Sequence, residues 1–108
     1  MNPAIEARHL LRYHRYGALS TLSKKLTGFP FGSITPYLTD QDGSLIILIS
    51  ALAEHTKNIH HDPRVSLITH NQSNPEIQMQ GRVTVVGTAH RLDCPQPLLT
   101  RYLRIFSR

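Results

Sequence analysis

A polar segment lies between two apolar runs in the middle of the chain and reads SALAEHTKNIHHDPRVSL, from Ser50 to Leu67. Its hydroxyl, imidazole, amide and ammonium groups are donors of the kind that bind phosphate. We predict that a strand ends at Ser50 and passes through Ala51 into a helix, whose first backbone N–H groups have no intrahelical acceptor. Such an end stabilises an anion. The segment therefore predicts a phosphate site, and the alternative is a solvated connecting helix.

Other chemistries fit this segment less well. Its histidines His55, His60 and His61 lie five and six residues apart, whereas two metal ligands on one helical face are three or four apart. We therefore expect no metal site. The sequence also lacks a glycine-rich phosphate loop, a nucleophile elbow and an HExxH motif. No catalytic residue is assigned, and any redox chemistry is expected to come from a bound cofactor.

Size and charge restrict the class of protein. The 108 residues suit a single domain spanning 1–108. The formal net charge of +5 favours anionic partners, from nucleotides to nucleic acid. Cys94 is the only cysteine, which excludes an internal disulfide and favours a reducing, cytoplasmic setting. No segment reaches the roughly 18 apolar residues of a membrane-spanning helix, so we expect a soluble protein without membrane contact.

The N-terminal half predicts one helix followed by strands. Asn2-Pro3 is typical of an N-cap and first turn, and apolar residues recur at helical spacing, which predicts a helix over 3–16. Alternating apolar and hydroxyl residues predict strands over 18–23 and 31–39. A turn at Asp40–Gly43 joins the second of these to a strand over 44–50, so the two should form a hairpin.

The C-terminal half predicts a short inserted helix over 52–61, which ends before Asp62-Pro63. Strands follow over 64–70 and 77–92, and an amphipathic helix over 96–107. The fold class is therefore dominated by β-structure with flanking helices. Five antiparallel strands in meander order favour a small barrel, because closure removes exposed edges. With a last strand missing, the barrel is expected to be incomplete at the C-terminus.

Three motifs occur in a familiar order: GFPFGSITPY, LIILISALAEHTKNIHHDPRVSL and QGRVTVVGTA. With them the chain resembles the FMN-binding split-barrel superfamily, in the branch related to pyridoxamine 5'-phosphate oxidase and to haem-utilisation proteins. The resemblance covers roughly Ala7 to Leu92 and rests on S-x-x-A-x-H-T-x-N-I combined with D-P-R-V-S. It implies a homodimer of split barrels, with one FMN in each of two clefts at the subunit interface.

The resemblance also implies which residues contact the cofactor. The strand residues implied to lie along the flavin are Ser33, Ile34, Thr35 and Pro36. Those implied to flank the ribityl chain or phosphate are Ser50 and Ala51, and those at the phosphate end, on the inserted helix, are His55, Thr56 and Asn58. A neighbouring strand is implied to supply the polar side chain of Arg82.

The chain departs from the family pattern at two places. Many relatives use an Arg-Lys pair near the start of the inserted helix, where this chain has His55-Thr56, as in the haem-utilisation branch. Strict oxidation of pyridoxamine phosphate is therefore not expected. Relatives also continue beyond a helix like Pro95–Arg108 into a further strand and often into a region that contacts substrate or haem. The chain thus resembles a C-terminally truncated member.

The leading prediction is an FMN-binding protein of the class of flavin-dependent oxidoreductases, in which the flavin accepts a hydride from a small-molecule substrate. The first alternative is a haem-binding protein of the same fold, with a histidine on the iron. The second is a cofactor-free module whose basic surface binds nucleic acid, although few aromatic side chains are available to stack on bases. The alternative to the flavin contacts is that Ser33 and Thr35 are outward strand hydroxyls and that Arg82 is a surface cation.

Overall fold

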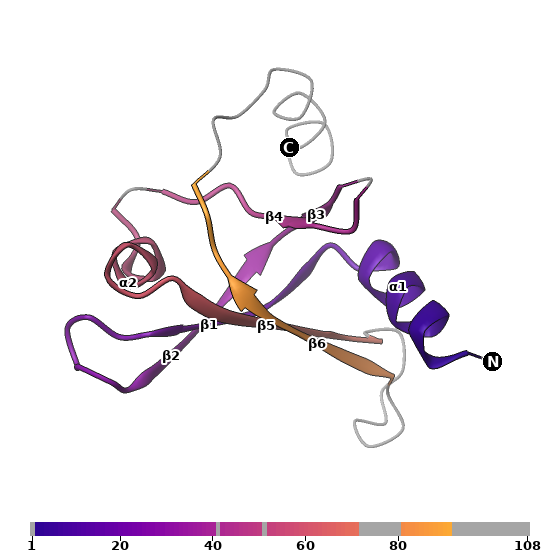
Figure 1. Ribbon diagram of the computed structural model, residues 1–108, viewed down its shortest axis with the longest axis horizontal. Coiled ribbons are helices and arrows are strands. Elements are labelled where there is room, and N and C mark those ends of the chain that lie inside the picture. Colours follow the sequence, from indigo (N-terminus) through magenta and orange to yellow (C-terminus); the bar gives the residue numbers. More distant parts are fainter. Residues whose placement is uncertain (1, 41, 51, 72–80, 92–108) are drawn as a thin grey trace.

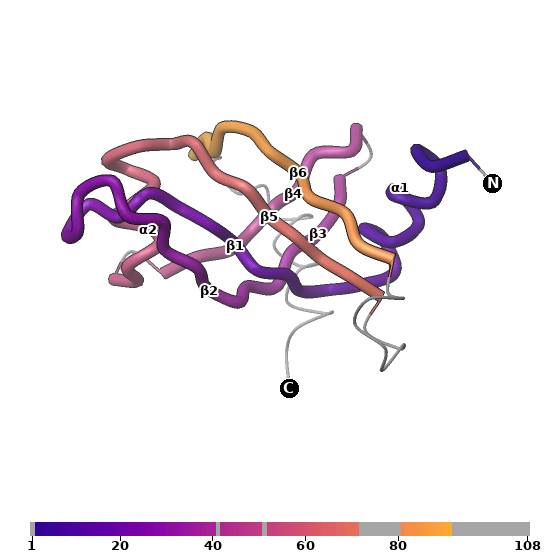
Figure 2. Tube along the Cα trace, turned by 90° about the horizontal axis from the view of Figure 1, so that it is seen from below, coloured from indigo at the N-terminus to yellow at the C-terminus, as the bar shows by residue number. Residues whose placement is uncertain are grey.

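The computed structural model describes residues 2–40, 42–50, 52–71 and 81–91. Strands β2, β1, β5 and β6 form an antiparallel sheet in that order, and β3 and β4 form a two-stranded hairpin. The two helices lie at opposite ends of the larger sheet (Figure 1, Figure 2). The elements in chain order are α1 (Pro3–Tyr13), β1 (Tyr16–Leu22), β2 (Pro30–Pro36), β3 (Leu38–Thr39), β4 (Leu45–Ile46), α2 (Glu54–His61), β5 (Arg64–His70) and β6 (Arg82–Thr88).

The strand register gives the larger sheet one covered face and one open face. Leu19 of β1 lies opposite Ser33 of β2 and Leu67 of β5. The next row places Ile34 and Ile68 on the other face, because side chains alternate along a strand. Leu19 and Leu67 are buried, whereas Ile34 is 70% exposed. We call the face that carries Ser33 the covered face, and the face that carries Ile34 the open face.

The hydrophobic core lies on the covered face. Leu19, Tyr37 and Leu67 form its buried cluster. Side chains from α1, β4, the segment after β4, α2 and β5 pack against this cluster: Leu11, Leu45, Ile47, Ile59 and Val65. Burial of each large apolar side chain contributes about 1.5–3 kcal/mol. Both helices and the hairpin are therefore held to the sheet by one shared core.

Tyr37 divides the segment that the sequence predicts as a single strand over 31–39. β2 ends at Pro36, whose ring nitrogen has no hydrogen to continue the ladder. The N–H of Tyr37 donates to the carbonyl of Arg15 (2.9 Å), and its hydroxyl donates to the carbonyl of Leu11 (2.6 Å). The chain thus leaves the larger sheet at Tyr37. The predicted hairpin exists, but β3 rather than β2 pairs with the strand that follows.

The predicted turn of this hairpin is confirmed. The N–H of Gly43 donates to the carbonyl of Asp40 (3.0 Å), and Gly43 adopts a φ of 89°, which favours glycine. The strand after the turn is shorter than the predicted 44–50. It comprises Leu45–Ile46, because β3 offers two residues for pairing.

The predicted meander order is wrong. β1 lies between β2 and β5, and its residues 18–20 pair with residues 66–68 of β5. A Cβ at Gly17 would lie 2.6 Å from the carbonyl oxygen of Ile68. Glycine is therefore needed where β1 passes β5. The pairing of β1 with the distant β5 gives the sheet its strand order.

The N-terminal helix starts as predicted and ends early. The Asn2 side chain accepts a hydrogen bond from the N–H of Ala4 (2.8 Å), which confirms the N-cap. The helix ends at Tyr13 rather than at residue 16, because the C-cap His14 has an extended backbone. β1 accordingly runs from Tyr16 to residue 22 instead of over 18–23.

The remaining elements follow the prediction closely. The strand over 64–70 is confirmed at both ends, and the inserted helix begins at Glu54 rather than at residue 52. Within the predicted run 77–92, β6 is the strand that the structure describes. Residues 77–80 and 92, Cys94 and the predicted helix over 96–107 lie outside the described residues. No helix in the described ranges is long and apolar enough to cross a membrane.

Candidate functional site

Two residues predicted from distant motifs meet where β2 faces α2. The Ser33 hydroxyl oxygen lies 3.0 Å from Nδ1 of His55, and both side chains are half-buried. Ser33 projects from the covered face of the sheet, against which α2 packs. We call the region formed by Ser33, Ser50, His55 and Thr56 the β2–α2 seam.

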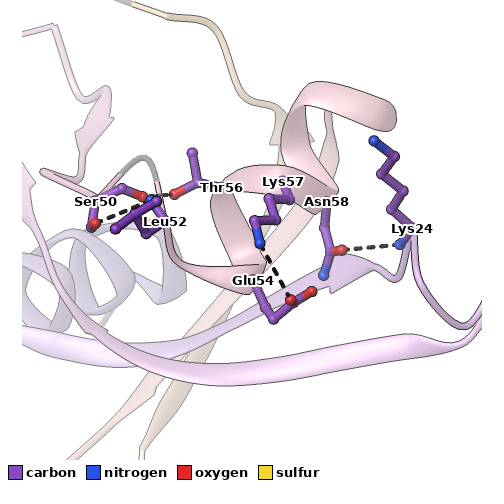
Figure 3. A network of polar contacts seen from close by, with 7 residues as sticks. All are labelled: Lys24, Ser50, Leu52, Glu54, Thr56, Lys57 and Asn58. Atoms are coloured by element: carbon purple, nitrogen blue, oxygen red, sulfur yellow. Dashed lines mark hydrogen bonds and ion pairs between the residues drawn. The ribbon is translucent and has the colours of Figure 1, made fainter.

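Ser50 organises the turn that leads into α2. Its hydroxyl oxygen accepts the N–H of Leu52 (3.2 Å), and its carbonyl accepts the N–H of Ala53 (3.2 Å). The same carbonyl accepts a hydrogen bond from the hydroxyl of Thr56 (Figure 3). Thr56 is buried, and its hydroxyl hydrogen is already used. Thr56 therefore fixes the turn from inside and does not present a donor to the outside.

The N-terminus of α2 has no side-chain cap. Ala53 occupies the N-cap position, and its carbonyl accepts the N–H groups of Thr56 and Lys57 at 3.1 and 3.3 Å. The N–H groups of Glu54 and His55 have no intrahelical acceptor, because they lie in the first turn. The Glu54 carboxylate forms an exposed ion pair with Lys57 (3.9 Å). The helix thus presents backbone donors where an anion is stabilised.

Asn58 is fully buried behind the seam. Its Oδ1 accepts the backbone N–H of Lys24 (2.9 Å), and its Nδ2 donates to the hydroxyl of Thr21 (3.0 Å; Figure 3 shows the first contact). Its amide therefore bonds within the protein and is turned away from the start of the helix. Sequence reasoning missed Thr21. Its alternation with Leu19 along β1 was the available signal, because it places both residues on one face.

The predicted flavin-side residues of β2 are divided between the two faces of the sheet. Thr35 is buried on the covered face with Ser33, and its hydroxyl donates to the carbonyl of Pro36 (3.2 Å). The outward orientation considered for Thr35 is thus wrong. Ile34 is on the open face, and Pro36 lies half-buried at the end of the strand.

Arg82 does not join the seam within this chain. It is the exposed first residue of β6 and pairs with His70 of β5. β2 and β6 are the two edges of the sheet, so three inter-strand spacings, about 14 Å, separate them. Ala51 lies outside the described residues. The described ranges hold no cluster of three or more His, Cys, Asp or Glu side chains that could bind a metal ion.

The D-P-R motif at the other end of α2 has a structural role. Asp62 is the C-cap residue, and its carboxylate accepts hydrogen bonds from the backbone N–H, Nε and Nη2 of Arg64 at 3.1, 3.0 and 2.7 Å. These hydrogen bonds lower the pKa of Asp62 to about 2. The pair fixes the turn from α2 into β5, on the far side of the helix from the seam.

Comparison with known proteins identifies the family to which this fold belongs. The family model described as Pyridoxamine 5'-phosphate oxidase matches residues 4–105. The chain belongs to the pyridoxamine 5'-phosphate oxidase family. A non-canonical haem oxygenase, HOZ, of the Arabidopsis thaliana chloroplast is 38% identical over 89 residues. That match covers 82% of this chain and 27% of the plant protein, so the chain spans about a quarter of that relative.

Solved structures of split-barrel type have the same fold as this family member. A haem-binding protein from Mycobacterium smegmatis superposes with a TM-score of 0.79 at 26% identity, over 98% of this chain and 46% of that chain. The haem storage protein HutZ from Vibrio cholerae superposes with a TM-score of 0.76 at 20% identity, over 98% of this chain and 77% of its own. The antiparallel split-barrel class predicted from the sequence is thus confirmed, and both of these solved structures are named as haem proteins.

Proposed function

We propose that this chain binds FMN at the β2–α2 seam and forms the cofactor-binding part of a flavin-dependent oxidoreductase. The observation that carries the proposal is the uncapped N-terminus of α2 beside the contact between Ser33 and His55. An anionic group is stabilised there by free N–H groups and by the helix dipole. Membership of the pyridoxamine 5'-phosphate oxidase family supports a phosphate-bearing cofactor.

The residues of the seam fit a phosphate through main-chain rather than side-chain donors. The N–H groups of Glu54 and His55 and the hydroxyl of Ser50 are available to donate, whereas the charge of Lys57 is paired with that of Glu54. Thr56 and Asn58 have their donors engaged inside the protein. In this proposal those two residues shape the site, whereas Ser50 and the first turn of α2 bind the phosphate.

The flavin ring is proposed to lie along β2, against residues 33–36. Bound FMN supplies hydride acceptance from a small-molecule substrate. The chain itself binds and orients. Ser33 fixes the imidazole of His55 through Nδ1, and β2 is an edge strand whose free side offers unpaired main-chain groups to a planar ring. A cytoplasmic location belongs to the same proposal.

The open face of the sheet supports a homodimer. Ile34, Ile68 and Val86 are exposed on three of its four strands. A large apolar surface on a sheet face is stabilised when a second copy covers it. In the proposed dimer, the partner subunit's Arg82 approaches the cofactor, because Arg82 of the same chain lies at the opposite edge of the sheet from β2. Ile34→Asp should convert a dimer into a monomer in sedimentation equilibrium, whereas Leu26→Asp in the exposed β1–β2 loop should not.

Haem is the second candidate cofactor, because a relative 38% identical and a structure 26% identical are named as haem proteins. His55 is the histidine that the seam orients. Its Nδ1 faces Ser33, which leaves Nε2 as the nitrogen available to iron. The charged propionates of haem suit the same helix N-terminus that suits a phosphate.

Titration of the ligand-free protein with FMN and, separately, with haemin tests both candidates. If the proposal is correct, FMN fluorescence is quenched on binding, and Ala53→Asp, which places a carboxylate at the N-cap, weakens FMN about tenfold or more. Haem binding would instead give a Soret band that His55→Ala removes and that His60→Ala, an exposed control on the same helix, retains. Absence of binding to FMN would overturn the leading proposal.

A further inference from the structure

A buried polar network lies behind the β2–α2 seam and joins four segments of the chain: α2, β1, the β1–β2 loop and β2. Asn58 of α2 is 0% exposed and Thr21 of β1 is 2% exposed. Asn58 accepts from the backbone N–H of Lys24 in the β1–β2 loop and donates to the Thr21 hydroxyl. The Thr21 hydroxyl in turn donates to the carbonyl of Phe31 on β2, over a longer 3.5 Å.

The direction of each hydrogen bond in this network is determined. The N–H of Lys24 is a donor, so the Asn58 oxygen must face it and the Asn58 NH2 group must face Thr21. The Thr21 oxygen accepts from that NH2 group, so its own hydrogen points to the carbonyl of Phe31. The chain of donors therefore runs from α2 through β1 to β2. None of these groups is directed toward the N-terminus of α2.

The network runs parallel to the contact between Ser33 and His55. Asn58 is three residues after His55, about 4.5 Å along the helix axis. Phe31 is two residues before Ser33 on the same face of β2, about 7 Å along the strand. The separation of α2 and β2 at the seam is thus set by hydrogen bonds one helical turn away. An unpaired polar group at this buried place is costly, so the separation resists change.

We propose that Asn58 and Thr21 are positioning residues, which hold α2 at a fixed distance from β2 and thereby orient His55 toward Ser33. The inference assigns Asn58 a role other than the phosphate contact implied by the family resemblance. This positioning role belongs to the ligand-free protein, so it does not depend on whether FMN, haem or neither binds.

Nuclear magnetic resonance on the ligand-free protein tests the proposal. Thr21→Val is nearly isosteric and removes the hydroxyl, so it should shift the Nδ1 resonance of His55 and speed hydrogen exchange of the Lys24 amide about tenfold. Thr21→Ser keeps the hydroxyl and should return both values toward those of the wild type. This rescue distinguishes positioning through the hydroxyl from loss of packing.

Thr69→Val is the matched control. Thr69 is also a fully buried threonine on the covered face, and its hydroxyl donates to the carbonyl of Tyr16 (3.0 Å) on the neighbouring strand. Its loss should destabilise the protein but leave the His55 resonance and the Lys24 exchange rate unchanged. An equal shift of His55 in both valine variants would overturn the proposal, as would an unchanged His55 in folded Thr21→Val.

The wild type provides a second test should Thr21→Val fail to fold. The side-chain NH2 hydrogens of Asn58 should exchange with solvent as slowly as the Lys24 amide, because both belong to one network. Rapid exchange at Asn58 beside slow exchange at Lys24 would overturn the proposal. Neither measurement uses a cofactor, so failure of this inference is distinguishable from failure of FMN binding.

Discussion

The two helices are held in place in different ways. α1 has 11 residues, a side-chain N-cap from Asn2 and no buried residue. α2 has 8 residues and no side-chain cap, yet it buries Thr56 and Asn58, both hydrogen-bonded within the protein. α1 thus has a local side-chain cap and receives a tertiary hydrogen bond at the carbonyl of Leu11, whereas α2 has no such cap and inserts two polar side chains into the protein. The helix that lacks a local cap is the one that presents free N–H groups at the seam.

Among substitutions in the two helices, removal of the Asn58 side chain should cause the largest loss in the free energy of unfolding. Asn58→Ala leaves the Lys24 N–H without its acceptor and the Thr21 hydroxyl without its donor inside the protein. Urea unfolding should show a loss of about 2–4 kcal/mol in the free energy of unfolding. A loss as small as that of an exposed α1 substitution, such as Arg8→Ala, would contradict the tertiary account of α2.

Thr56→Val should cause the next largest loss in the free energy of unfolding. It preserves the shape of the side chain but removes the hydrogen bond to the Ser50 carbonyl, and it should cost about 1–2 kcal/mol in urea unfolding. FMN affinity should also fall, because the turn that carries Ser50 loses its inner support. Thr27→Val in the exposed β1–β2 loop is the control, and it should change neither quantity.

Asn2→Ala should cost about 1 kcal/mol or less, because it removes an exposed N-cap from a helix that buries no residue. Thermal unfolding should show a slightly lower midpoint, and the first turn of α1 should fray in amide exchange. FMN affinity should be unchanged. An altered affinity would mean that the two helices are coupled.

A side-chain cap added to α2 should change the free energy of unfolding by a smaller amount and would make α2 more like α1. Ala53 has the extended backbone of an N-cap residue, so Ala53→Ser should add about 0.5–1 kcal/mol to the free energy of unfolding. Its hydroxyl would accept a helix N–H that the proposed phosphate needs, so FMN affinity should fall while stability rises. A rise in both would argue against phosphate binding at this helix end.

The smallest expected effect is a loss of stability at low pH that arises from Asp62 at the C-terminus of α2. The pKa of Asp62 is about 2 in the folded protein, below the ordinary value of about 3.9 for an unfolded aspartate. The stability contributed by this group is therefore present above about pH 4 and is lost as the pH falls toward 2. The difference in unfolding free energy between wild type and Asp62→Asn should disappear over that window. A constant difference across it would contradict the role of the Arg64 pair.

Local sequence signals predicted most elements of the fold but not their arrangement. Strand 64–70 was predicted correctly because its apolar residues alternate and Pro63 marks its start. Pairing of β1 with β5 was not predictable from propensity, because it joins residues more than 40 positions apart in the chain. The division of 31–39 at Tyr37 depends on hydrogen bonds to Leu11 and Arg15, which belong to another element.

The candidate site was predictable in position but not in detail. The change from strand to helix after Ser50 indicated a helix N-terminus, and the structure has one there. Residue types suggested Thr56 and Asn58 as donors to a ligand. Their direction was not encoded in spacing alone, because inward and outward polar side chains look alike in a short helix. The partner of Asn58, the backbone of Lys24, carries no side-chain signal at all.

The phenol of Tyr37 connects the end of α1 to the rest of the molecule, which has a consequence at alkaline pH. Burial raises the pKa of Tyr37 above its ordinary value of 10.0, so the folded protein keeps the hydroxyl protonated as a donor to Leu11. The unfolded chain ionises first, and stability from this group is lost as the pH rises past 10. Base should therefore weaken the attachment of the N-terminal helix, and Tyr37→Phe should show the same weakening at neutral pH as faster amide exchange in α1.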